Sequence, residues 1–202
     1  MISTLLFTWL QGADFYFDLH KQAVDFLPAG HGETWLDIGS GPGLVTRLAA
    51  ERGWRATGID TDPQMVAAAK RIASWKHSPA EFQMGDFTTL PAESAQVVSA
   101  ASSLAVLPDR EAGLRSLWHL LLPGGFLLIV EPTQQMTREN ACRAIQNGLP
   151  KKRIAGLRMW ANARQGNIVD PIIYETLGAE SIRFTRLLQG LVGAWVMQKP
   201  SI

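Results

Sequence analysis

Short runs of apolar residues alternate, over the first two thirds of the chain, with segments whose apolar positions recur at helical spacing. This alternation is typical of a parallel β-sheet whose strands are joined by helices. Strands are predicted at residues 34–38, 55–60, 80–84, 97–101 and 126–131. Helices are predicted at residues 14–27, 44–52, 63–75 and 109–121. We therefore expect five parallel strands connected by right-handed helical crossovers.

The last third of the chain has a different pattern. Residues 137–163 have a helical period that is interrupted near Gly148-Leu-Pro150, and a short helix is predicted near residues 171–176. Two further apolar runs, 182–188 and 192–198, are joined by Gln189-Gly190. So short a connection permits an antiparallel hairpin and excludes a crossover helix. The pattern as a whole predicts a three-layer α/β fold, with a seven-stranded, mostly parallel sheet and helices on both faces.

The length of the chain suits one domain, which we expect to span residues 1–202. Residues 1–29 are predicted to form an N-terminal helical cap. Residues 133–178 are predicted to form a helical insertion between the fifth strand and the hairpin. Because insertions at the carboxyl edge of a parallel sheet lie over its cleft, we expect this one to cover the substrate.

Composition and charge disfavour several classes of protein. The formal net charge is +1, so no overall field draws the chain to nucleic acid, and no nucleic-acid partner is expected. No segment approaches the roughly 20 apolar residues that span a bilayer. The apolar N-terminal residues lack an early Lys or Arg and are predicted to form a helix or arm, not a signal peptide. Cys142 is the single cysteine, so no internal disulfide is possible and a cytoplasmic location is expected.

A glycine-rich turn is the strongest local signal. Gly39, Gly41 and Gly43 lie between the first strand and the following helix. Glycine permits a sharp turn and the close approach of a ligand, and the helix presents free N–H groups behind it. The spacing G-x-G-x-G differs from the G-x-G-x-x-G of dinucleotide-binding enzymes. The alternative is a turn that serves packing alone.

Two acidic positions follow at the ends of later strands. Asp60 ends the second strand, and its two oxygens are able to accept both hydroxyls of a ribose. The alternative role, a helix N-cap, suits Asp62 before Pro63 better. In Gly85-Asp86-Phe87, Asp86 is able to accept from an exocyclic amine, and Phe87 offers an apolar surface for adenine. The alternative for Asp86 is an aspartate that caps a turn.

Together these segments resemble the class I, Rossmann-like S-adenosylmethionine-dependent methyltransferases, and look closest to the small-molecule, quinone-biosynthesis type. The resemblance covers roughly residues 30–132 and 180–199, including Val97–Asp109, Leu122–Pro132 and the closing hairpin, which matches the family's reversed last strand. It implies S-adenosylmethionine as the cofactor. This sequence departs from the family at Ala105 and Val106, where relatives often carry two histidines, and at Gln96, where they often carry an aspartate.

The resemblance also implies a role for individual residues. The glycine loop, including Ser40, would wrap the methionine portion, with Asp37 near its ammonium group and Tyr16 closing over it. Asp60 would hold the ribose. The remaining positions implied to contact the cofactor, around its adenosine and beneath its methyl group, are Thr61, Asp62, Met65, Asp86, Phe87, Ala101 and Ser102.

The catalytic group is less defined by the sequence. Methyl transfer needs mainly alignment, and a base only where the acceptor loses a proton. His20 and Glu131 are candidates, with a packing histidine and a strand-end acid as the alternatives. The four histidines (His20, His31, His77 and His119) are scattered, and no zinc spacing or other metal site is predicted.

Residues 138–164 are rich in Lys and Arg, and Trp160 and Tyr174 are candidates for lining the substrate site. The basic stretch is either a lid over an anionic or flat substrate, a solvated helix face, or a membrane-surface helix. We expect methyl transfer to a small-molecule acceptor. RNA or protein methylation, and cofactor binding without catalysis, are the alternatives, while the glycine spacing disfavours a nicotinamide oxidoreductase. The acceptor and the oligomeric state stay open.

Overall fold

The computed structural model of the protein describes residues 4–201, so residues 1–3 of the predicted N-terminal cap lie outside the described part. Seven strands of this part form one sheet in the order β3-β2-β1-β4-β5-β7-β6. Their bounds are β1 Thr34–Ile38, β2 Arg55–Asp60, β3 Glu81–Met84, β4 Ala95–Ala101, β5 Leu121–Pro132, β6 Ser181–Leu187 and β7 Val192–Gln198. Strands β1 to β5 pair in parallel, and β7 is antiparallel to both β5 and β6. The predicted mostly parallel sheet with a reversed last strand is confirmed.

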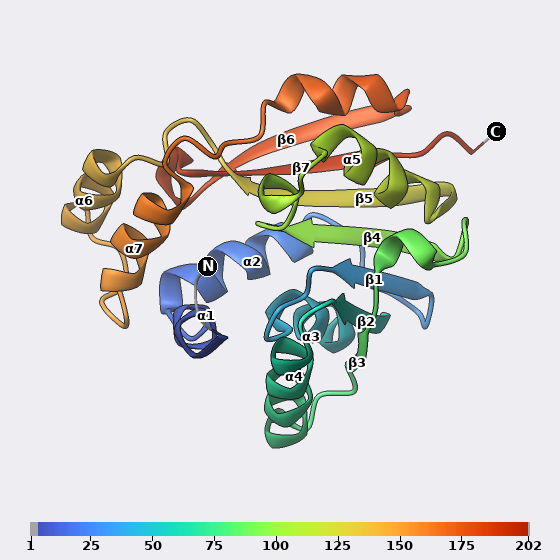
Figure 1. Ribbon diagram of the computed structural model, residues 1–202, viewed down its shortest axis with the longest axis horizontal. Helices are drawn as coiled ribbons and strands as arrows, with labels where there is room; N and C mark the ends of the chain where they lie inside the picture. The colour runs from blue at the N-terminus through green and yellow to red at the C-terminus, as the bar shows by residue number, and fades with distance from the viewer. Residues whose placement is uncertain (1–3, 202) are drawn as a thin grey trace.

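Helices cover both faces of this sheet (Figure 1). The α-helices are α1 Thr4–Gln11, α2 Asp14–Asp25, α3 Leu44–Glu51, α4 Pro63–Lys76, α5 Arg110–His119, α6 Arg138–Gln146 and α7 Ala155–Arg164. Short 3-10 helices are η1 Phe87–Thr89, η2 Leu104–Val106, η3 Pro171–Leu177 and η4 Leu188–Gly190. In Figure 1, α3 and α4 lie on one side of the sheet and α5 on the other, while α1, α6 and α7 gather at the end toward which β4 points. No helix within residues 4–201 is long and apolar enough to cross a bilayer.

The alternation of side chains along the central strands explains the two apolar layers. On β5, Leu128 and Val130 pack into a core with α2, α3 and α7. Their neighbours Leu127 and Ile129 pack into a second core with α5 and η3. Successive side chains of a strand point to opposite faces, so a strand that is buried on both faces must be apolar throughout.

The fifth strand is longer than its sequence predicts. It begins at Leu121, and Leu121 pairs with Ala95 before the register shifts between Ala95 and Val97. The residues predicted as a turn, Pro123 to Gly125, therefore form the irregular start of this strand, with Gly124 at φ +73°. As a consequence α5 ends at His119, two residues before the predicted helix end.

Gly43 is required by the way α3 meets the sheet. It is the N-cap residue of α3 at φ +78°, and a Cβ built on it would lie 2.2 Å from Cε1 of Phe82. Gly178 also has a positive φ, +63°, but a Cβ there would meet nothing within 4 Å.

We expect Gly43→Ala to lower the free energy of unfolding by about 2–5 kcal/mol, because left-handed backbone strain and overpacking against Phe82 add. The matched variant Gly178→Ala carries only the backbone strain, about 1–2 kcal/mol. Urea unfolding of both variants checks this. If both variants lost the same free energy of unfolding, the Phe82 side chain would be shown to move aside without an energetic cost.

Candidate cofactor-binding site

The glycine turn lies against the carboxyl ends of the neighbouring strands. Gly39 and Gly41 have φ values of +67° and +52°. The N–H groups of Gly39 and Ser40 donate to the carbonyl oxygen of Ile59 on β2, at 2.8 and 3.1 Å. A Cβ at Gly39 would lie 2.7 Å from Cβ of Ser103, which follows β4. The turn therefore needs glycine where it bends and where it approaches the β4 loop.

Asp60 shares this rim with the glycine turn. Its Oδ2 accepts from the Gly41 N–H at 2.8 Å, and its Oδ1 accepts from the Asp62 N–H at 2.9 Å. Asp62 itself caps α4, with its carboxylate accepting from the Gln64 N–H and Pro63 in the first turn. The capping alternative thus belongs to Asp62. Each oxygen of Asp60 keeps a further lone pair for a ligand.

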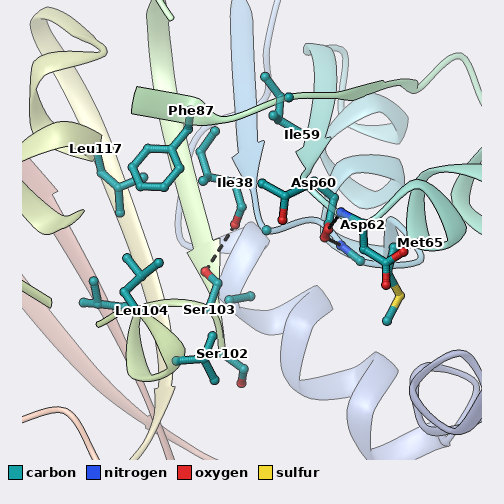
Figure 2. A pocket seen from close by; sticks show the side chains of 17 residues that line it. Ile38, Ile59, Asp60, Asp62, Met65, Phe87, Ser102, Ser103, Leu104 and Leu117 are labelled. Atoms are coloured by element: carbon teal, nitrogen blue, oxygen red, sulfur yellow. Dashed lines mark hydrogen bonds between the residues drawn. The ribbon is translucent and has the colours of Figure 1, made fainter. Parts of the chain in front are cut away.

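A cavity of about 360 Å³ opens beside Asp60 (Figure 2). Among the predicted residues, Gly39, Gly41, Asp60, Thr61, Asp62, Met65, Phe87, Ala101 and Ser102 line it. Its volume falls in the usual range for small-molecule sites. Asp60, Thr61 and Asp62 provide polar groups on one side, Ser102 and Ser103 provide two hydroxyl-bearing residues after β4, and most of the remaining lining is apolar.

Much of the apolar lining was not predictable from the sequence. It comprises Ile38, Ile59, Leu104, Val106, Leu107 and Leu117. The sequence pattern places Ile38 and Ile59 in buried strands. Their position near the carboxyl ends of these strands is the one feature of the sequence that could have indicated contact with a cavity. Leu117 lies on α5, and only the packing of this helix on the sheet brings it to the cavity. No local pattern marks such a residue.

A second, small cavity of about 10 Å³ adjoins the first, since Gly39 and Ala101 line both. Its lining includes the predicted residues Tyr16, Asp37 and Ser40, together with His20 and, from α1, Gln11. This volume is close to that of one water molecule. Helix α2 and its Tyr16 therefore close this end of the site.

Asp37 is a buried carboxylate that joins three elements. Its Oδ2 accepts from the N–H and the hydroxyl of Thr46 on α3, at 3.1 and 2.7 Å. Its Oδ1 accepts from the Ser99 hydroxyl on β4 at 2.8 Å, and the Trp35 indole N–H donates to the same Ser99 oxygen. Burial raises the pKa of Asp37 to about 6, against these hydrogen bonds, which lower it. The carboxylate thus supports the glycine turn structurally as well as lining the small cavity.

Two predicted contact residues line neither cavity. Gly43 packs against Phe82, as described above. Asp86 is exposed, and its Oδ1 accepts from the N–H and the hydroxyl of Thr88, at 2.9 and 2.8 Å. These bonds lower the pKa of Asp86. The structure therefore shows Asp86 as a capping residue, and its contact with adenine stays a prediction.

His20 is a neutral, oriented imidazole. Its Nδ1 lies 2.8 Å from the carbonyl oxygen of Tyr16, and its ring lies 4.2 Å from the Tyr16 ring. Because a carbonyl only accepts, Nδ1 carries the proton and Nε2 keeps its lone pair. Burial lowers the pKa of His20 to about 4.

Glu131 supports the wall of the larger cavity from behind. Its Oε1 accepts from the N–H groups of Leu104 and Ala105, at 2.9 and 3.3 Å. Its Oε2 is buried and has no hydrogen-bond partner within the described residues. Burial raises the pKa of Glu131 to about 7, although Arg164 lowers it. Glu131 lines neither cavity.

The candidate substrate residues are buried rather than exposed to a cleft. The Trp160 ring lies 5.3 Å from Tyr16, and the Tyr174 ring lies 5.1 Å from Trp195. Neither residue lines the two cavities, so their contact with a substrate stays a prediction. No group of His, Cys, Asp or Glu among the described residues is arranged to hold a metal ion.

The cationic side chains of residues 138–164 include some that form ion pairs and some that bind backbone carbonyls. Arg143 pairs with Glu139 at 2.9 Å, and Lys152 pairs with Asp14 at 3.4 Å. Arg153 and Arg164 instead donate to backbone carbonyls, those of Trp9 and Ser102, both at 2.5 Å. Most of this stretch therefore faces solvent, while two arginines hold it to the rest of the domain.

A parallel sheet with an acid beside a glycine turn and an apolar nucleoside-sized cavity defines a Rossmann-like nucleoside-binding domain. Residues 36–129 match the family described as a methyltransferase domain. Nocamycin O-methyltransferase of Saccharothrix syringae is 29% identical over 185 residues, which are 88% of this chain and 59% of that protein. Trans-aconitate 2-methyltransferase of Delftia acidovorans is 35% identical over 133 residues, 62% of this chain and 47% of that protein. These similarities indicate a class I S-adenosylmethionine-dependent methyltransferase.

The comparison with solved structures agrees on the fold. Phosphoethanolamine N-methyltransferase 2 of Haemonchus contortus, solved in complex with S-adenosyl-L-methionine, matches with a TM-score of 0.69 at 16% identity. The match covers 98% of this chain and 56% of that one. The chain thus spans about half the length of the relatives it matches, from 47% to 59% in the three proteins named.

The Thr46 hydroxyl stabilises Asp37, and we expect Thr46→Val to lower the free energy of unfolding by about 1–3 kcal/mol, because a buried carboxylate oxygen loses the nearer of its two donors and keeps only the Thr46 N–H. Thr88→Val is the matched control, because Thr88 donates the same kind of bond to the exposed Asp86. The control should change stability by less than about 0.5 kcal/mol. Urea unfolding measures both, and equal losses would contradict a special role for the buried network.

The raised pKa of Glu131 makes stability depend on pH. Between pH 4.5 and about 7 the folded protein retains a proton that the unfolded chain releases, so the contribution of Glu131 to stability falls as pH rises through this window. The free energy of unfolding of Glu131→Gln, compared with wild type, should therefore gain up to about 3 kcal/mol from pH 4.5 to pH 8. Glu139→Gln, at an exposed position, should show no such trend in denaturant titrations.

Proposed function

We propose that this protein transfers a methyl group from S-adenosylmethionine to a small-molecule acceptor. The observation that carries the proposal is the charge at the rim of the cavity. Asp60 and Asp62 line the larger cavity and Asp37 lines the smaller one, while no Lys or Arg is among the described residues that line either. An acidic rim attracts a cationic ligand and disfavours the pyrophosphate of a dinucleotide.

The larger cavity fits an adenosine. The free lone pairs of Asp60 suit the two ribose hydroxyls, and the apolar wall with Phe87 suits the adenine ring. The methionine portion would extend past Gly39 toward Tyr16, where about 10 Å³ is open. Binding of the whole cofactor therefore requires α2 and its Tyr16 to shift outward, and we propose that residues 1–29 act as a cap that does so.

S-adenosylmethionine supplies a methyl group on a cationic sulfur that is already an activated leaving group. The protein's own residues then have two tasks, to orient the ligand and to exclude water from the site. The glycine turn and the Asp60 carboxylate orient it. Tyr16 and the apolar wall exclude water.

A base is needed only for an acceptor that loses a proton on attack. We propose His20 for this role, since it lines the small cavity and keeps a free Nε2 lone pair at neutral pH. Glu131 also has a buried oxygen without a partner in the described chain, but it lines neither cavity and contacts the lining only through its hydrogen bond to the Leu104 N–H. We assign it to support of the wall.

The acceptor is proposed from chemistry shared with the relatives. Two of them are named for methylation of small organic molecules, nocamycin and trans-aconitate. We propose a small molecule also for this chain, covered by the insertion at residues 133–178 and contacted by Trp160 and Tyr174 after a shift of the insertion. The single cysteine is in accord with a cytoplasmic enzyme.

Isothermal titration with S-adenosylmethionine tests the assignment. We expect Asp60→Ala to weaken binding by about 5- to 150-fold, which is about 1–3 kcal/mol, because ribose hydroxyls lose their acceptors. Asp109→Ala is the control: Asp109 caps α5 through the Ala112 N–H and lines neither cavity, so its loss should leave the affinity unchanged.

Titration with NAD under the same conditions separates the enzyme classes. The acidic rim predicts no measurable binding of NAD. Tight binding of NAD, or equal affinity of Asp60→Ala and wild type for S-adenosylmethionine, would refute the proposed site.

A further inference from the structure

The segment that follows β4 forms one wall of the larger cavity and is held from three directions. Ser102, Ser103 and Leu104 line the cavity, as Figure 2 shows. Glu131 on β5 accepts from the N–H groups of Leu104 and Ala105. Arg110 on α5 donates to the carbonyl oxygen of Ala105 at 3.3 Å. The third restraint comes from α7.

Ser102 is the strained residue of this segment. Its φ is +55°, in the left-handed region, where a residue other than glycine is held at a cost of about 1–2 kcal/mol. Its N–H donates to the carbonyl oxygen of Val130 at 2.8 Å. Its hydroxyl oxygen is buried and has no hydrogen-bond partner within residues 4–201. Strain and an unused polar group at a cavity wall mark a position that the surrounding structure maintains for a ligand.

Arg164 holds the carbonyl of this strained residue. It lies in the last turn of α7, and its Nη2 donates to the Ser102 oxygen at 2.5 Å. No ion pair within 4.0 Å is present for Arg164 in the described chain, so the carbonyl is its direct partner. A charge-assisted bond of this kind is stronger than one between neutral groups. The bond spans from the insertion at 133–178 to the cavity wall.

The rest of α7 is tied to the other end of the site. Trp160, one turn before Arg164, packs against Tyr16, and Tyr16 lines the small cavity. Burial raises the pKa of both Glu131 and Tyr16, and the Arg164 guanidinium lowers the pKa of each. One helix therefore contacts both the wall and the cap of the site that the proposed function assigns to the cofactor.

We infer that Arg164 is a positioning residue of the cofactor site: through the Ser102 carbonyl it holds the cavity wall in its left-handed conformation and couples α7 to occupancy of the cavity. The inference rests on the proposed function, since the ligand is S-adenosylmethionine or its demethylated product. Ligand binding at the wall then fixes the helix that lies over the acceptor side. Because such coupling is reciprocal, loss of the bond between Arg164 and Ser102 weakens binding of the ligand.

Calorimetric titration with S-adenosylhomocysteine tests this inference without an acceptor. We expect Arg164→Met to weaken binding by about 5- to 20-fold, within the usual range of coupling between sites. Arg164→Lys keeps a cationic donor and should restore most of the affinity. Arg158→Met, at an exposed position of the same helix, removes the same charge from α7 and should change affinity by less than about twofold.

Variants of Ser102 test whether Arg164 acts on the cavity through this residue. Glycine adopts positive φ without strain, so in Ser102→Gly the wall needs less support. Adding Arg164→Met to Ser102→Gly should then weaken binding by less than about threefold, a coupling that a double-mutant cycle measures. Ser102→Ala retains the strain, and the full effect of Arg164→Met should persist there.

Hydrogen exchange supplies a readout that a purely structural role would not move. S-adenosylhomocysteine should protect the amides of residues 102–106 and 155–164 in wild type, and only those of 102–106 in Arg164→Met. Equal affinity of wild type and Arg164→Met, or protection of α7 that survives the substitution, would overturn the inference. Absence of binding to wild type would instead refute the proposed function.

Discussion

The structure depends on one carboxylate that is taken out of water at the end of a buried strand. Asp37 is only 2% exposed, and such a group is tolerated only where donors surround it. Thr46 and Ser99 provide them, so the start of α3 and the end of β4 must converge on β1 at this point. The glycine turn occupies the space between these elements, and the larger cavity opens beside it.

The electrostatic character of the site follows from the same arrangement. Asp60 ends β2 beside the turn, and its bond to the Gly41 N–H holds the second acid on the same rim. Asp60 and Asp62 line the larger, mostly apolar cavity and no Lys or Arg of residues 4–201 lines it, which suits a ligand with hydroxyl groups and a positive charge. The wall opposite is a strained loop whose restraints come from β5, α5 and α7. Residues near one edge of the sheet position the acidic rim, whereas elements from distant parts of the chain hold the wall in place.

Sequence patterns predicted the strands and their chemistry where the signal was local. The first strand has its predicted bounds of 34–38, because an apolar run followed by a glycine turn leaves one register. The capping of α4 by Asp62 was also predictable, since Asp before Pro marks a helix start. Prediction was wrong at the start of β5, where pairing with Ala95 extends the strand over residues expected to turn. Pairing between distant residues overrides local turn preference there.

The sequence by itself determined the order of elements, the glycine turn and the acids at the strand ends. Each of these depends on neighbouring residues and on the period of the side chains. Only the tertiary structure decided that Leu117 reaches the cavity, that Asp86 caps a turn, and that Arg164 holds the Ser102 carbonyl across 62 positions of the chain. These contacts join segments whose separation in sequence carries no signal of their distance in space. Packing of the helices on the sheet determines them.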